Sequence, residues 1–324
     1  MSTKNHRNRE KSFNFVLMKK DLNLAKKTLE DGNLVIFPTE TVYGLGGDAT
    51  NIDAIKKIYY LKKRPESNPL ICHFKNKEEV KKNFEISKLD NLLINLFWPG
   101  PLTLILKKKE ESIISSLLSN NLNLIGCRVP NHPIANKLLQ SLNFPLAAPS
   151  ANIATKISST HSDHLSDDLK NNAYILKGGN STLGLESTVI QTIEDEIKIL
   201  RLGSIIVEDI KYKFPNKKIT IENFNSELSP GNQLKHYSPN LPIRINVIKV
   251  KNNEGLLNFG RNNLKSHICE YNLSPNGDLN EASKNFFNFL HLIDNSKSTG
   301  IAVAPIPNYG LGKTINDRLI RASS

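Results

Sequence analysis

The segment LKKRPESNP contains the side chains of this sequence that are best suited to binding phosphate. Lys62 and Arg64 lie two positions apart, and Asn68 follows in the same polar stretch. Residues two apart in an extended segment point to the same side, so both cations can contact one chain of phosphates. A solvated basic turn explains the same residues equally well. This segment alone therefore leaves both interpretations open.

A second polar segment, APSAN, directly follows an apolar run that is typical of a strand. Ser150 and Asn152 would be neutral hydrogen-bond donors, and their small neighbours would let a ligand approach the backbone. In α/β proteins, loops at strand ends are common ligand sites. A plain turn is the alternative. Two hydroxyl residues in GLEST, Ser187 and Thr188, offer similar donors, with a helix-capping motif as the alternative.

Two segments indicate the wall of a ligand site. The loop PTETVYGLGGD has glycines after an apolar run, but it matches neither the dinucleotide-binding fingerprint nor the P-loop. Its Thr, Tyr and Gly residues favour a tight pocket wall. Arg128 lies in the apolar segment IGCRVP, and a buried arginine needs an anion as its partner. A ligand carboxylate and an internal Asp or Glu are equally good partners.

The elements that would position these residues alternate between strand and helix. Apolar runs predict strands at 34–37, 102–106, 125–130 and 243–250, and helical periodicity predicts helices at 52–61, 78–97, 133–142, 282–293 and 314–322. We divide the chain into a flexible N-terminus at 1–14, a mixed-sheet α/β domain at 15–215, a linker at 216–240 and a small α/β domain at 241–324.

Composition excludes several classes of protein. The chain has 324 residues, of which 39% are hydrophobic, so it is neither collagen-like nor disordered. No apolar run approaches the ~20 residues of a membrane helix, which predicts a cytoplasmic protein with no membrane partner. Cys72, Cys127 and Cys269 form no CxxC pair, so they predict neither a disulfide framework nor a zinc site. The net charge of +12 favours polyanionic partners such as nucleotides or RNA.

Taken together, the segments resemble the YrdC-like threonylcarbamoyl-AMP synthase family. PTETVYGLGGDA, KKRPESNPLI, WPGPLTLIL, CRVPNHPIA, APSAN, GLESTVI and ILRLGSI occur in the family's order and spacing. SPGNQLKHYSP and GLGKTINDRLIRAS resemble the long form of the family. The resemblance implies a YrdC-like mixed-sheet α/β catalytic domain and a small Rossmann-like α/β C-terminal domain, joined by a linker that folds over the active site.

The resemblance also implies a reaction. The family condenses L-threonine, bicarbonate and ATP into threonylcarbamoyl-AMP and pyrophosphate, as nucleotidyltransferases. A downstream threonylcarbamoyl-transferase complex uses this product for the threonylcarbamoyladenosine modification of tRNA. We expect Mg²⁺ to accompany ATP, and we predict no protein metal ligands because the sequence shows no clustered carboxylates.

The family's motifs assign candidate site residues by position. The paired Lys-x-Arg and Ser-x-Asn motifs give the catalytic set Lys62, Arg64, Ser150 and Asn152. The ATP-binding positions are Arg64, Asn68, Ser150, Ser158, Arg201 and Tyr237. The threonine-binding positions are Thr39, Thr41, His73, Arg128, Ala148 and Ser187. Tyr237 falls in the linker, which makes it a candidate part of a lid that excludes water.

Two alternatives differ from this interpretation. YrdC-like domains are associated with double-stranded RNA, and the net charge permits a non-catalytic RNA-binding or ribosome-maturation protein. The chain lacks the aromatic platforms and arginine-rich tracts of common RNA-binding modules. The carbamoyltransferase of hydrogenase maturation embeds a similar domain, but it would need cysteines in CxxC pairs.

Overall fold

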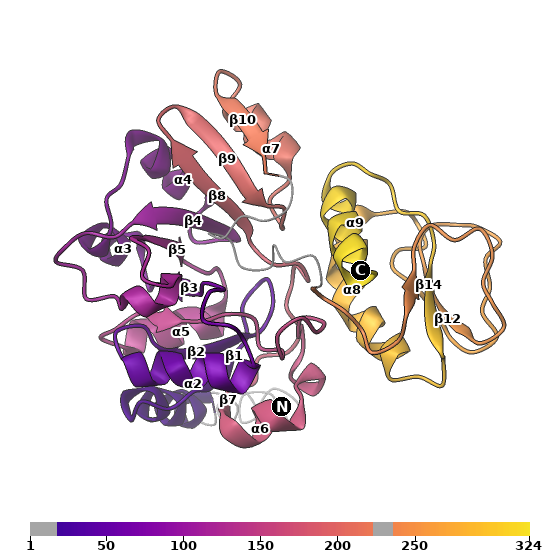
Figure 1. Cartoon of the computed structure of the whole chain (residues 1–324), viewed down its shortest axis with the longest axis horizontal. Coiled ribbons are helices and arrows are strands. Elements are labelled where there is room, and N and C mark those ends of the chain that lie inside the picture. The colour runs from indigo at the N-terminus through magenta and orange to yellow at the C-terminus, as the bar shows by residue number, and fades with distance from the viewer. Residues whose placement is uncertain (1–17, 223–235) are drawn as a thin grey trace, which may run out of the picture.

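The computed structural model describes residues 18–222 and 236–324, which form two α/β units (Figure 1). The predicted flexible N-terminus at 1–14 and most of the predicted linker at 216–240 lie outside these residues. Residues 218–221, near the start of the predicted linker, form an edge strand of the first unit. Within the described ranges, no helix is long and apolar enough to cross a membrane.

The first unit is built on a mixed sheet of ten strands, in the order β10-β9-β8-β4-β5-β3-β6-β2-β1-β7. The sheet contains both parallel pairs, such as β3 with β5, and antiparallel pairs, such as β4 with β5. The strands are β1 (Val35–Phe37), β2 (Gly44–Asp48), β3 (Ile71–His73), β4 (Leu102–Lys107), β5 (Leu124–Arg128), β6 (Leu146–Ala147), β7 (Tyr174–Ile175), β8 (Thr188–Ile193), β9 (Glu196–Arg201) and β10 (Lys218–Ile221).

Helices cover this sheet, and their ends follow from local sequence. The side chain of Asn51 caps the first turn of α2, and Lys63 ends that helix in the left-handed conformation, at a φ of 52°. The helices are α2 (Ile52–Lys62), α3 (Lys77–Asn83), α4 (Lys88–Phe97), α5 (Pro133–Ser141), α6 (Asp167–Asn172) and α7 (Val207–Lys213), with a further helical segment at 18–30.

The single helix predicted at 78–97 is wrong, because this segment forms two helices. Phe84 is extended and bridges Lys108, and Ser87 then begins α4 with a capping box that involves Asp90. The hydrophobic period continues through the break, so the pattern alone does not reveal it.

The second unit has a parallel sheet of four strands, in the order β11-β14-β12-β13. In Figure 1, its helices α8 (Leu279–Asp294) and α9 (Leu311–Ala322) lie between this sheet and the first unit. The strands are β11 (Ile243–Arg244), β12 (Glu254–Asn258), β13 (Glu270–Asn272) and β14 (Gly300–Val303). The predicted strand at 243–250 is shorter than expected, because Asn246 adopts a φ of 55°.

The apolar core of the second unit extends into the first. Phe286 and Phe287 of α8 are fully buried in a cluster that also contains Val42, Leu185 and Tyr237. Gly184, at a φ of +75°, lets the two units approach closely, since a Cβ there would lie 2.4 Å from the carbonyl oxygen of Ser283. The two units are therefore packed against each other through a shared apolar core.

Candidate active site

A cavity of about 50 Å³ lies where loops of the first unit meet the described end of the linker. This volume has room for only a few water molecules. Most of the predicted site residues line it: Thr39, Thr41, Arg64, His73, Arg128, Ala148, Ser150, Ser187, Arg201 and Tyr237. Lys62, Asn68, Asn152 and Ser158 are buried nearby without lining it. The segments that the sequence analysis singled out thus come together in space.

Lys62 holds the turn that carries Ser150 and Asn152. It is the last residue of α2, its side chain is 1% exposed, and its Nζ donates to the backbone carbonyl oxygen of Ser150 at 2.5 Å and to that of Asn152. Burial, and secondly the Arg64 charge, hold the pKa of Lys62 well below its usual range. The Lys-x-Arg and Ser-x-Asn motifs therefore meet, but through the backbone of the turn rather than across the cavity.

Arg64 is fixed by its own loop. Its Nε donates to the carbonyl oxygen of Asn68 at 3.0 Å and its Nη2 to that of Pro69 at 2.8 Å, and Nη2 also contacts the side-chain oxygen of Asn68. Burial is the largest influence on this guanidinium and lowers its pKa to about 10, so it stays charged at neutral pH. Asn68 accordingly orients Arg64 from behind the cavity wall.

Arg128 has an internal carboxylate as its partner. Its Nη2 lies 2.6 Å from Oε1 of Glu40, which is also buried, and its Nη1 donates to the Thr41 hydroxyl at 2.9 Å. Of the two anions that the sequence left open, the protein's own glutamate occupies this position. Burial, and secondly the Arg128 charge, lower the pKa of His73 to about 3, so His73 is neutral here.

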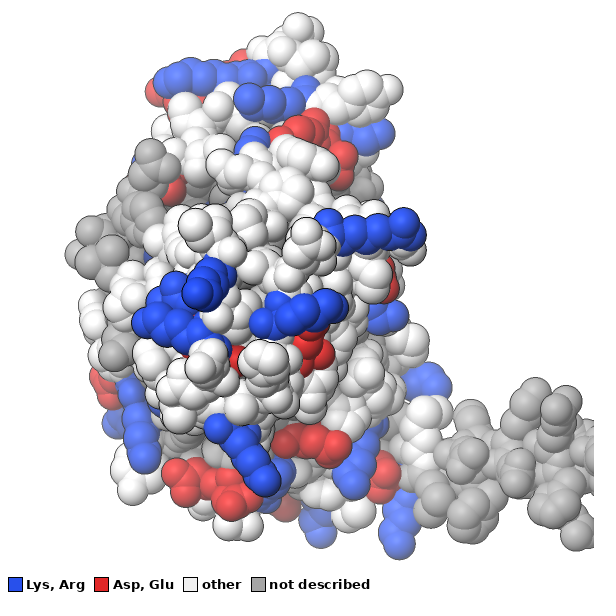
Figure 2. Space-filling view, turned by 90° about the vertical axis from the view of Figure 1, so that its right-hand side faces the viewer, with Lys and Arg blue, Asp and Glu red and all other residues white. Residues whose placement is uncertain are grey.

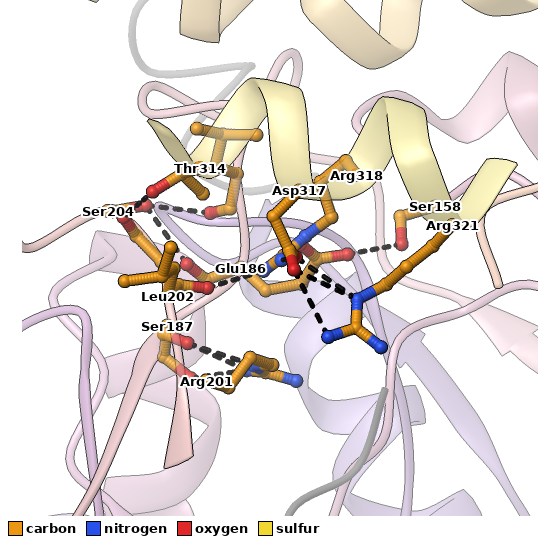
Figure 3. Close-up of polar contacts among 12 residues, drawn as sticks. Ser158, Glu186, Ser187, Arg201, Leu202, Ser204, Thr314, Asp317, Arg318 and Arg321 are labelled. Atoms are coloured by element: carbon orange, nitrogen blue, oxygen red, sulfur yellow. Dashed lines mark hydrogen bonds and ion pairs between the residues drawn. The ribbon is translucent and has the colours of Figure 1, made fainter. Parts of the chain in front are cut away.

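Arg201 and the GLEST segment form the wall beside the second unit (Figure 3). Nη2 of Arg201 donates to the carbonyl oxygen of Ser187 at 2.8 Å and to its hydroxyl at 3.0 Å. The Ser158 hydroxyl donates to Oε1 of Glu186 at 2.6 Å. The sequence analysis missed Glu186, although the GLEST segment that contains it was singled out for its hydroxyls.

Two linker residues, His236 and Tyr237, also line the cavity. The Tyr237 ring is 1% exposed and stacks on Phe287 of α8, with ring centroids 5.6 Å apart. Burial raises the pKa of Tyr237 to about 12, and burial together with the Arg64 charge holds the pKa of His236 well below its usual range. Both side chains are therefore uncharged at neutral pH.

The cavity wall favours anions. Arg64, Arg128 and Arg201 line it, and the two nearby carboxylates, Glu40 and Glu186, are both paired with arginines. Throughout residues 18–222 and 236–324, no group of three or more His, Cys, Asp or Glu side chains is placed to hold a metal ion. The three arginines of the wall therefore suit a phosphate-bearing ligand.

Family models match both units of the chain. Residues 27–203 match the family described as "Telomere recombination", and residues 197–324 match the family described as "Threonylcarbamoyl-AMP synthase, C-terminal domain". The first match covers the ten-stranded sheet up to β9, and the second continues to the C-terminus. The two matches follow one another along almost the whole chain.

Relatives of similar length share this organisation. The threonylcarbamoyl-AMP synthase of Bacillus subtilis is 33% identical over 92% of this chain and 92% of its own length, and that of Pyrococcus abyssi is 32% identical over 93% and 94%. The crystal structure of P. abyssi Sua5 complexed with L-threonine superimposes with a TM-score of 0.83 at 31% identity, covering 93% of this chain and 94% of that one.

Proposed function

This chain belongs to the threonylcarbamoyl-AMP synthase family, and we propose that it condenses L-threonine, bicarbonate and ATP into threonylcarbamoyl-AMP and pyrophosphate. The reaction is a nucleotidyl transfer: an oxygen of N-carboxylated threonine attacks the α-phosphorus of ATP, and pyrophosphate leaves. The observation that carries the proposal is the cavity, where three arginines from separate segments converge with neutral hydroxyls.

The charge of the cavity suits this step. Both reactants are anionic, and negative charge is redistributed over the phosphate oxygens as the bonds change, so fixed cations and excluded water should provide most of the catalysis. We assign this compensation to Arg64 and Arg201, which backbone contacts hold in place. Ser150 would orient the phosphates, and Lys62 and Asn152 would keep its turn in position.

We assign threonine to the opposite wall. Thr39, Thr41, His73, Arg128 and Ala148 line the cavity, and so does Ser187, whose hydroxyl lies 2.7 Å from that of Thr103. The solved complex of P. abyssi Sua5 contains L-threonine, which supports this class of substrate. Because Glu40 pairs with Arg128, the threonine carboxylate would have to share this guanidinium with an internal carboxylate.

Mg²⁺ would enter with ATP. Glu40 and Glu186, the carboxylates nearest the cavity, are each held by an arginine, so they do not form a metal cage. Mg²⁺ keeps much of its water and binds nucleotide phosphates readily, and it would neutralise phosphate charge. The residues of this chain would then bind the nucleotide without coordinating the metal themselves.

The product is a mixed anhydride that a further enzyme must consume. We propose that a threonylcarbamoyl-transferase complex takes it for the threonylcarbamoyladenosine modification of tRNA. A cytoplasmic location would bring the enzyme together with ATP and tRNA.

The test is pyrophosphate release from the purified full-length chain. Release should require L-threonine and bicarbonate together, and Arg64→Met should abolish it, whereas Arg261→Met, at an exposed position of the second unit, should not. Pyrophosphate release without threonine, or equal rates for the two variants, would contradict the proposal.

The net charge of +12 also favours direct binding of double-stranded RNA as a second candidate function. Figure 2 shows the face of the second unit, where Lys and Arg lie in small groups among uncharged residues, Asp and Glu. The described residues on this face therefore offer no continuous basic track to an RNA backbone. Binding of a duplex RNA with an affinity that ATP does not change would support the second function.

A further inference from the structure

Arg318 belongs to the second unit, but most of its polar contacts are in the first. It comes from α9, and it is the largest by volume among the fully buried side chains of the described residues. Its Nε donates to Oε2 of Glu186 at 3.1 Å and its Nη2 to the carbonyl oxygen of Leu202 at 2.6 Å (Figure 3). Its Nη1 contacts Asp317 of its own helix.

Glu186 is the reason why this contact matters for the site. It is 5% exposed and lines the cavity, and its Oε1 accepts the hydrogen bond from Ser158. A carboxylate in the wall of an anion site repels phosphate, and a low dielectric strengthens that repulsion. Arg318 supplies the opposite charge on the side of Glu186 that faces the second unit.

Arg318 and Glu186 belong to a larger group of ion-paired side chains. Asp317 also pairs with Arg321, at 3.1 Å, so this group of side chains contains two guanidinium groups and two carboxylates, including Glu186. The guanidinium of Arg318 also lies over the Tyr237 ring, 4.8 Å from its centroid. One side chain of the second unit thus contacts two residues that line the cavity.

We propose that Arg318 is a positioning residue of the active site, which neutralises Glu186 and thereby preserves the affinity of the cavity for the triphosphate of ATP. The second unit then sets the charge of a cavity whose lining residues belong to the first unit and the linker. This inference rests on the proposed function, because it takes the ligand to be a nucleotide triphosphate.

The experiment measures binding of ATP with Mg²⁺ to the full chain by isothermal titration calorimetry, without threonine. Arg318→Met removes the guanidinium that pairs with Glu186, so the dissociation constant should rise by about 10-fold or more. The double variant R318M/E186Q removes both charges and should recover to within about 3-fold of the unsubstituted chain. The control is K313M/E208Q, which removes an exposed ion pair of 2.8 Å across the same interface and should change the constant less than about 2-fold.

Two results would overturn the inference: no recovery in R318M/E186Q, or an effect of R318M no larger than that of K313M/E208Q. A purely structural role of Arg318 would give the first result, because the double variant still lacks the guanidinium. If R318M does not fold, R318M/E186Q still tests the inference, because it has a neutral Gln at position 186. An ATP affinity that matches the unsubstituted chain supports the inference, and a lower affinity contradicts it. Failure of the proposed function is seen separately, as absent pyrophosphate release by the unsubstituted chain.

Discussion

At the scale of single residues, the two cations of the Lys-x-Arg motif have different roles. Arg64 and Lys62 lie two positions apart, yet Arg64 lines the cavity and Lys62 holds backbone carbonyl oxygens behind it. Lys62 ends α2 with its side chain turned inward, and Lys63 takes the left-handed conformation that redirects the chain. The two cations therefore do not point to the same side, as an extended segment would require.

Substitution of Lys62 by Met should remove the support of the Ser150 turn. The carbonyl oxygen of Asn152 would lose its Lys62 donor and that of Ser150 would keep only the backbone N–H of Asn152, so the free energy of unfolding should fall by about 2 kcal/mol and ATP binding should weaken. Urea denaturation and calorimetry measure the two effects. Lys57→Met is the matched control, because Lys57 lies on the same helix and binds Gly32 and Asn33 at the surface. Equal stability of the two variants would show that the turn does not depend on Lys62.

At the scale of elements, much of the fold could be predicted from periodicity and capping. The helices expected at 52–61 and 282–293 correspond to α2 and α8 within a few residues. The prediction of a single helix at 78–97 was wrong because one apolar face continues across the extended residue Phe84. The site was partly predictable: the loops that form its wall stood out by composition, whereas Glu186 and Arg318 depend on how the two units pack, which no local pattern encodes.

The linker should protect the reaction from water. Tyr237 lines the cavity and is held by Phe287 and Arg318 of the second unit. Tyr237→Ala should therefore lower the yield of threonylcarbamoyl-AMP per ATP consumed, as water reaches the anhydride. Chromatography quantifies threonylcarbamoyl-AMP and the remaining ATP in the same sample. Tyr309→Ala, at an exposed tyrosine of the second unit, is the control, and unchanged coupling and ATP affinity in Tyr237→Ala would refute the lid.

A histidine pair joins α8 to the first unit and should make the contact sensitive to acid. The rings of His164 and His291 stack with centroids 4.2 Å apart, and Nε2 of His291 lies 3.2 Å from the carbonyl oxygen of Ser158. Burial is the largest cause that lowers the pKa of both rings to about 4. In the unfolded chain these histidines take up protons near their ordinary pKa of about 6.5. The free energy of unfolding is therefore highest above that pH and falls as the pH drops toward 4.

We expect protonation of the two rings to lower the free energy of unfolding by about 4 kcal/mol between about pH 7 and pH 5, about 2 kcal/mol for each ring. Thermal unfolding across this range measures the slope. H164F/H291F should have a smaller slope, because phenyl rings stack without taking up protons. His267→Gln, at an exposed histidine, is the control and should keep the slope of the unsubstituted chain. An unchanged slope in the double variant would exclude the pair as the acid-sensitive contact.

At the scale of the whole molecule, the two units are packed tightly against each other. Their contact includes the fully buried Arg318, the bond of the Thr314 hydroxyl to the carbonyl oxygen of Gly203 at 3.0 Å, and the shared apolar cluster around Phe287. The active site lies against this contact, so its geometry depends on the packing of the two units.

Two glycines with the same φ test this dependence. Gly184→Ala would place a Cβ 2.4 Å from backbone of α8, whereas Gly179→Ala meets nothing within 4 Å, and both have a φ of +75°. Gly179→Ala should lose about 1 kcal/mol through backbone strain alone. Gly184→Ala should lose at least about 3 kcal/mol and most of the pyrophosphate release, because the units must move apart. Urea denaturation measures the stability, and equal losses would show that the close approach is dispensable.

The small volume of the cavity has a kinetic consequence. Ligand pockets usually hold about 300–1,000 Å³, so we expect that a cavity of about 50 Å³ must widen to admit ATP, and that the lining residues His236 and Tyr237 move as it does. Each turnover would then contain an opening before substrate entry and another before product departure, and such motions limit the rate of many enzymes. The maximal rate of this enzyme should accordingly decrease as the solvent is made more viscous with sucrose or glycerol.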